Sequence, residues 1–120
     1  FPRVNEPLTG RQTRYGYACP QRTWDFEFDF EGVLKYDFET GTSRGHYYGA
    51  TEVSGEHVFA ADPAGTAEDD GWLMSFVSDK TTERSELVIL DARDIAAEPV
   101  ARIKMAARVP IGFHANWFAD

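Results

Sequence analysis

The sequence predicts an all-β fold, and three observations support this class. Aromatic residues make up 14% of the 120 residues, and the apolar segments are short and rich in aromatic and β-branched side chains. Turn-forming glycines and prolines separate these segments. In the clearest segment, residues 24–31, aromatic and acidic residues alternate strictly, so one face of a strand would be buried and the other would carry carboxylates.

The first half of the chain predicts four strands with turns between them. Gly32 breaks the first strand, and residues 33–38 predict the second. Gly41 is expected to take a positive φ in the tight turn that follows, because glycine has no Cβ to clash there. A third strand runs through residues 46–48, and residues 56–61 predict a short fourth strand.

The second half predicts an acidic loop, a hairpin and a last strand. Residues 62–71 (DPAGTAEDDG) are rich in turn formers and lack the alternating ligand spacing of a calcium-binding loop, so an aspartate there is expected to cap a turn ahead of Gly71. Residues 72–77 and 86–90 predict a hairpin, and residues 100–105 predict a strand after a crossing loop.

A weak internal repeat relates the two halves. Trp24 and Trp72 each open a strand, and they lie roughly 50 residues apart, which is the spacing of propeller blades. An ordinary meander with hairpins of similar length would give the same spacing. Two blades cannot close a ring. Together with a first residue, Phe1, that is not Met, this suggests a piece of a longer chain, and a natural domain is the alternative.

Composition excludes several classes of function. The net charge of −8 argues against a nucleic-acid partner and against an anionic membrane surface. We expect neither a membrane-spanning segment nor a signal peptide, because no apolar run reaches the length of either. A single cysteine, Cys19, excludes an internal disulfide and a cysteine-based zinc cluster. The sequence therefore predicts a soluble, cytoplasmic protein.

Histidine is the residue type in this chain that could bind a transition metal. His46, His57 and His114 form no pair at helical spacing, so no local metal site is indicated, and a lone histidine is most often structural. His114 differs because Pro110 and Gly112 precede it and aromatic residues flank it. Such a segment can hold an imidazole rigidly, either as a ligand or as an ordinary core histidine.

Glu56 stands at the entry to an apolar strand, where a buried carboxylate would need a partner. One suitable partner is the free N–H of a metal-bound imidazole, which such a carboxylate orients. The alternative is a solvated edge residue, paired with an arginine. Strand alternation predicts that Glu56 and His57 face opposite sides, with His57 on a polar face.

Six segments, taken together and in order, resemble the C-terminal part of the carotenoid cleavage oxygenase family. This family includes apocarotenoid- and stilbene-cleaving dioxygenases and a retinoid isomerase. The resemblance covers essentially the whole chain, and the segments that carry it are FPRV (1–4), RYGYA (14–18), EHVF (56–59), AEDDG (67–71), SELVILDA (85–92) and VPIGFH (109–114).

The resemblance implies a seven-bladed β-propeller, of which residues 1–120 would form about two blades plus a closing strand, as the C-terminal part of a single domain. Four histidines from different blades would hold a non-haem iron(II) on the propeller axis. His114 would be one of these ligands, and Glu56 would orient a ligating imidazole. His57 stands where the family usually has a proline, and neither it nor His46 matches a ligand segment of the family.

The resemblance also implies an enzyme that uses O₂ to cleave a conjugated C=C bond of a carotenoid, apocarotenoid or stilbene into two carbonyl products. The isolated chain would bind iron poorly and be inactive, because the remaining blades supply the other ligands. Any contact with a membrane would run through parts outside this chain. Two other functions stay open: a metal-free propeller that serves as an interaction module, and a free-standing β-sandwich that binds a small ligand.

Overall fold

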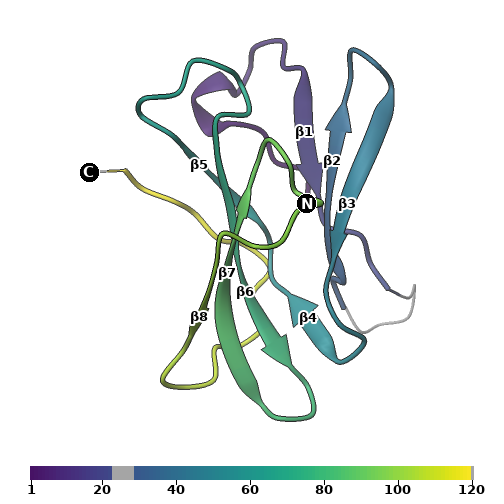
Figure 1. Ribbon diagram of the computed structural model, residues 1–120, viewed down its shortest axis with the longest axis vertical. Helices are drawn as coiled ribbons and strands as arrows, with labels where there is room; N and C mark the ends of the chain where they lie inside the picture. Colours follow the sequence, from purple (N-terminus) through teal and green to yellow (C-terminus); the bar gives the residue numbers. More distant parts are fainter. Residues whose placement is uncertain (23–28, 120) are drawn as a thin grey trace.

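The computed structural model of the chain describes residues 1–22 and 29–119. Within those ranges the chain forms one short 3-10 turn, η1 (Glu6–Leu8), and a series of β-strands (Figure 1). The strands are β1 (Tyr15–Ala18), β2 (Gly32–Asp37), β3 (Thr42–Tyr47), β4 (Glu52–Ser54), β5 (Val58–Ala61), β6 (Gly71–Asp79), β7 (Arg84–Asp91) and β8 (Ala101–Lys104). The prediction of an all-β fold is confirmed.

The strands form two antiparallel sheets that pack face to face (Figure 1). The first sheet has the order β1-β2-β3, and the second has the order β4-β6-β7-β8, with β5 also paired to β6. Each sheet is thus a meander in which most neighbours in space are also neighbours in sequence. The predicted hairpin of residues 72–77 and 86–90 is the β6–β7 pair, in which Trp72 lies opposite Asp91 and Asp79 lies opposite Arg84.

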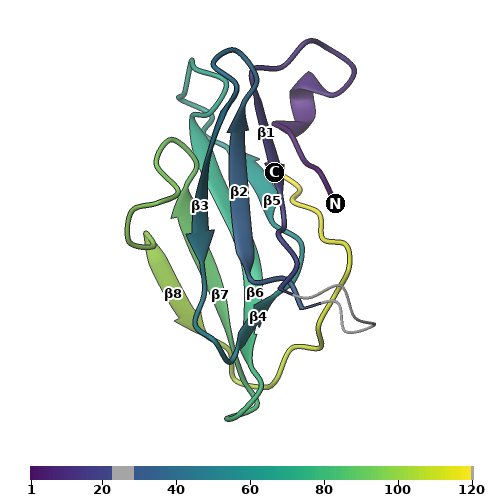
Figure 2. The ribbon, with the colours of Figure 1, turned by 90° about the vertical axis from the view of Figure 1, so that its right-hand side faces the viewer.

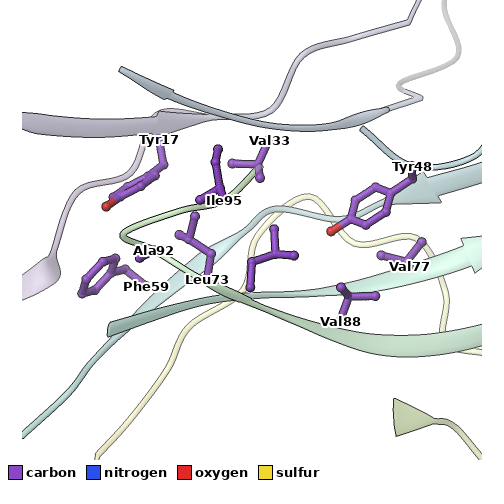
Figure 3. Close-up of a cluster of buried hydrophobic side chains, with 10 residues drawn as sticks. Tyr17, Val33, Tyr48, Phe59, Leu73, Val77, Val88, Ala92 and Ile95 are labelled. Atoms are coloured by element: carbon purple, nitrogen blue, oxygen red, sulfur yellow. The ribbon is translucent and has the colours of Figure 1, made fainter. Parts of the chain in front are cut away.

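The core lies between the two sheets (Figure 3). Tyr17 and Val33 point down from the first sheet, and Leu73 and Val88 point up from the second. Ile95, in the loop after β7, fills the space between them and is almost completely buried. The predicted crossing loop therefore contributes to the core as well as connecting two strands.

Turns form where the sequence predicts them. Gly41 has a φ of 69° between β2 and β3, as expected for a glycine in a tight turn. In the acidic loop, the Asp70 carboxylate accepts hydrogen bonds from the backbone N–H groups of Thr66 and Ala67, both at 2.8 Å. The acidic run is thus a turn closed by its own aspartate.

Two segments differ from simple strands. Residues 24–28 of the predicted strand 24–31 lie outside the described residues, and Phe30 makes isolated bridges to Gln21 and Ser54. Residues 105–119 contain no strand. They run back along the edge of the second sheet, past β4 and toward β5 (Figure 2). This return brings the C-terminal residues to the junction between β4 and β5.

Candidate metal centre

An interruption in the edge of the second sheet holds Glu56 and His57. Ser54 of β4 pairs with Val77, and Val58 of β5 pairs with Met74, so the three residues 55–57 lie opposite the two residues 75–76 of β6. An extra residue of this kind bends a strand and re-aims its side chains. The interruption therefore gives Glu56 and His57 orientations that a regular strand would not provide.

Glu56 is a buried carboxylate with two close donors. Its side chain is 3% exposed. Its Oε2 atom accepts hydrogen bonds from Nη2 of Arg3 at 2.7 Å and from the backbone N–H of Ala115 at 3.0 Å. Burial raises the pKa of Glu56, but the Arg3 hydrogen bond and the Ala115 N–H outweigh it, so the pKa lies below its ordinary value and the group is ionised at neutral pH.

His114 lies beside this carboxylate. Its Nδ1 atom is 3.5 Å from Oε2 of Glu56, and the ring of Phe1 contacts the imidazole edge-on with 4.9 Å between ring centroids. The His114 side chain is 69% exposed in this chain. With Nδ1 turned toward Glu56, the other ring nitrogen, Nε2, is on the opposite side of the imidazole. Metal-binding histidines use this arrangement, with one nitrogen for a carboxylate and the other for the metal.

The close approach of the C-terminal segment depends on a glycine that the sequence analysis did not single out. A Cβ on Gly55 would lie 3.2 Å from the carbonyl oxygen of Gly112. A Cβ on Gly112 itself would meet nothing nearer than the His114 carbonyl oxygen at 3.9 Å. Gly55 is therefore the residue whose missing side chain lets residues 109–115 reach the β4–β5 junction.

The prediction that His57 lies on a polar face is wrong, because its side chain is buried, with 2% of the residue exposed. Its Nε2 is 2.8 Å from the hydroxyl of Tyr48, and its Nδ1 is 3.5 Å from Sγ of Cys19, so both ring nitrogens have partners. Burial, together with the nearby charge of His46, lowers the pKa of His57 to about 3. The ring is therefore neutral at physiological pH. It contacts different groups from Glu56, although residues 55–57 lie between β4 and β5 rather than in the predicted strand.

The remaining histidine also has a structural contact. Nδ1 of His46, on β3, lies 3.0 Å from the carbonyl oxygen of Ile95. Across the described ranges, no three side chains of histidine, cysteine, aspartate or glutamate gather closely enough to hold a metal ion. The donors here fit one position of a metal centre, with His114 as the ligand and Glu56 as its support, and further ligands would come from elsewhere.

Sequence reasoning offered an arginine as an alternative partner of Glu56 but did not identify Arg3, expected Glu56 in that case to be solvated rather than buried, and missed the backbone of Ala115. Arg3 occurs in the FPRV segment but carries no local signal of its role, because its partner Glu56 is distant in the sequence.

None of the helical turns in the described residues has the length or hydropathy needed to cross a bilayer.

Comparison with known families and proteins agrees with the resemblance of the sequence motifs. The sequence profile of the retinal pigment epithelial membrane protein family matches residues 1–119. Apocarotenoid-15,15'-oxygenase from Synechocystis is 37% identical over 98% of this chain and 24% of its own length. Carotenoid 9,10(9',10')-cleavage dioxygenase 1 from Pisum sativum is 38% identical over 100% of this chain and 24% of its own length. The chain thus spans about a quarter of the length of these relatives.

Solved structures resemble this chain over the same extent. A variant of the Synechocystis apocarotenoid oxygenase superimposes with a TM-score of 0.91 and 36% identity over 100% of this chain and 25% of the solved chain. A cobalt-substituted form of the same oxygenase superimposes with a TM-score of 0.82 and 36% identity over 93% of this chain and 24% of that one. The first of these similarities covers both sheets, since it extends over the whole chain.

Proposed function

The chain belongs to the retinal pigment epithelial membrane protein family, the family of the carotenoid cleavage oxygenases, and on this basis we propose that it is part of an iron(II)-dependent dioxygenase. Its two sheets are blades of the β-propeller that the family forms. The enzyme would cleave a conjugated C=C bond of a carotenoid, apocarotenoid or stilbene. One C=C bond and one O₂ molecule give two carbonyl groups, so the reaction balances without a further reductant.

The observation that carries this proposal is the placement of the Glu56 carboxylate against Nδ1 of His114. Glu56 would accept a hydrogen bond from Nδ1–H and so fix the tautomer that leaves Nε2 free to bind a metal. Bound through neutral imidazoles, iron(II) would supply the position at which O₂ is activated. The cobalt-substituted form of the Synechocystis oxygenase supports a metal site in this family.

Aromatic residues border the same imidazole. Phe1 contacts the rings of both Phe113 and His114, with centroid distances of 6.2 Å and 4.9 Å. Both aromatic side chains thus lie close to the imidazole, which is itself 69% exposed in this chain. They also fit a substrate with an apolar conjugated chain, which favours a pocket walled by aromatic side chains.

The test is the variant His114→Ala in the full-length protein. We expect it to lose bound iron and to stop converting an apocarotenoid aldehyde, because the metal would lack one ligand. Iron is measured by mass spectrometry of the purified protein, and cleavage by the fall in visible absorbance of the polyene.

His46→Gln is the matched control, because His46 contacts the Ile95 carbonyl and not the candidate site. This variant should keep its iron. If His114→Ala retained the full iron content, the assignment of His114 would be wrong. If the unaltered protein bound no iron and consumed no O₂ with the polyene, the metal-free interaction module would be the better description.

We propose further that residues 1–120 form the C-terminal part of a single propeller domain within a longer polypeptide. The quarter-length match to the relatives supports this. The remaining blades would provide the other iron ligands, so the isolated chain would be inactive. A cytoplasmic location, with any membrane contact made by the other blades, agrees with the net charge of −8, and fractionation of cells that make the full-length protein tests it.

A further inference from the structure

We propose that Arg3 is a positioning residue of the candidate metal centre, because its guanidinium holds the Glu56 carboxylate and the Ala115 carbonyl together beside His114. The inference rests on the proposed function, since it assigns a role at the same site. It concerns the geometry of the ligand rather than the chemistry of the reaction.

Arg3 is fixed to the first sheet by its backbone. Its N–H donates to the carbonyl oxygen of Tyr17 at 2.7 Å, and the Tyr17 N–H donates back to the carbonyl oxygen of Arg3 at 2.8 Å. Tyr17 lies on β1, and its side chain is part of the core. The base of the Arg3 side chain therefore has a defined position, while the guanidinium reaches across to the second sheet.

The guanidinium closes a ring of three hydrogen bonds. Nη2 of Arg3 donates to Oε2 of Glu56 and to the carbonyl oxygen of Ala115. The backbone N–H of Ala115 donates in turn to Oε2 of Glu56. A rotation of the Glu56 carboxylate would break two of these bonds. Because Ala115 follows His114 directly, the same ring fixes the backbone that carries the imidazole.

The charge of Arg3 also suits this position. The Glu56 side chain is almost fully buried, and a buried carboxylate without a cation is strongly destabilised. Within the part of the chain that the structure describes, Arg3 is the lysine or arginine that pairs with Glu56. The planar guanidinium can hold two acceptors in a fixed geometry, which a lysine ammonium on a shorter chain does less well.

A second contact of Arg3 provides a matched control. Nη1 donates to Oε1 of Glu6 at 2.6 Å, and Glu6 lies at the exposed edge of the cluster. The variant Glu6→Gln removes this ion pair and leaves the ring of Arg3, Glu56 and Ala115 in place. If Arg3 acted on the metal centre only through its ion pairs in general, Glu6→Gln would also weaken metal binding. If Arg3 acts by holding Glu56, Glu6→Gln should leave metal binding unchanged.

The experiment is a titration of the metal-free full-length protein with Co²⁺ under anaerobic conditions. It follows the visible d–d absorption, which reports coordination geometry. We expect Arg3→Gln to weaken Co²⁺ binding about 10- to 100-fold and to change the shape of the spectrum, as loss of a group that orients a ligating histidine does. Arg3→Lys should recover part of the affinity, and Glu6→Gln should match the unaltered protein.

The outcomes separate this inference from the proposed function. If folded Arg3→Gln binds Co²⁺ with unchanged affinity and spectrum while His114→Ala loses it, Arg3 has no positioning role and the metal centre stands. If His114→Ala binds Co²⁺ normally, the metal centre itself is wrong. If Arg3→Gln does not fold, folded Arg3→Lys decides: an altered spectrum supports the inference, and an unaltered spectrum with unaltered affinity overturns it.

Discussion

Three histidines of this chain lie in different surroundings, and these surroundings determine what each imidazole can do. His46 contacts a carbonyl oxygen and belongs to the packing of the first sheet. His57 is enclosed, with a phenol at one nitrogen and a thiol at the other, which leaves neither nitrogen for a metal. His114 presents one nitrogen to a carboxylate and is otherwise exposed. Among these three histidines, His114 is the one whose ring nitrogen faces a buried carboxylate.

The enclosure of His57 predicts a loss of stability in acid. Its pKa is about 3 in the folded chain and about 6.5 when unfolded, so between these values the unfolded chain binds more protons. Stability contributed by neutral His57 is therefore complete above pH 6.5 and falls below it by about 1.4 kcal/mol per pH unit. At pH 5 the free energy of unfolding should be lower by about 2 kcal/mol.

Thermal unfolding of the metal-free full-length protein at pH 7.5 and pH 5.0 measures this effect. His57→Gln should reduce the difference between the two pH values, whereas His46→Gln should preserve most of it, because burial is the larger cause of the lowered pKa of His57. An equal acid sensitivity of the His57→Gln variant and the unaltered protein would show that another group is responsible.

At the level of elements, the sequence predicts the strands best where they pair with a neighbour without interruption. The hairpin of β6 and β7 and the turn at Gly41 form where the sequence predicts them, because alternation and turn chemistry are local properties. The predicted strand 56–61 instead begins at Val58. The extra residue at positions 55–57 is defined by the register of two different strands against β6, which periodicity along one segment does not contain.

The site shows the same division between local and distant information. The resemblance carried by the EHVF and VPIGFH segments identified Glu56 and His114 as candidate residues of the metal centre. The contact of Glu56 with Arg3 and the burial of His57 depend on segments far apart in the sequence. Lys35 is a further case: it is buried on β2 because its ammonium reaches Asp69 at 2.6 Å and the carbonyl oxygen of Ala92 at 2.7 Å.

Gly71, at the start of β6, tests how tightly the second sheet is packed. A Cβ there would lie 2.4 Å from the carbonyl oxygen of Ala60 and 2.8 Å from the ring of Phe59, a core residue. We expect Gly71→Ala to lower the free energy of unfolding by about 1–3 kcal/mol, because the strands must separate to accept it. Chemical denaturation of the full-length protein measures the change.

Gly112→Ala is the control, since its Cβ would make ordinary contact at 3.9 Å. This variant should change the free energy of unfolding much less than Gly71→Ala does. Equal stability of the two variants would mean that β5 and β6 adjust without cost at this point.

At the level of the whole molecule, the second sheet has one face in the core and one face open. Phe76, Leu87 and Ile103 lie in a row across β6, β7 and β8 on the open face. Phe76 is 40% exposed and Ile103 is 49% exposed. Adjoining them, Trp72, Met74 and Ile89 line a hollow of about 650 Å³ together with Val100 and Trp117. An apolar surface of this kind is typical of an interface.

The 120-residue chain produced alone should therefore self-associate. We expect its sedimentation coefficient to rise with protein concentration, because burying the apolar side chains of the open face between two copies lowers the free energy. Phe76→Lys should shift the chain toward the monomer. Thr42→Lys, which adds the same charge on the exposed strand β3, should not. A chain that sediments as a monomer at all concentrations would show that this face is stable in water.

The ring of hydrogen bonds among Arg3, Glu56 and Ala115 has a consequence for biosynthesis. Glu56 and Arg3 leave the ribosome well before residues 114 and 115, so a nascent chain carries the carboxylate for some time without its C-terminal partners. The imidazole that would receive the metal is translated after the side chains of Arg3 and Glu56, and Ala115 follows it directly. Metal loading at this position would then follow completion of residues 1–115, and a polypeptide released prematurely upstream of His114 would lack the means to acquire it.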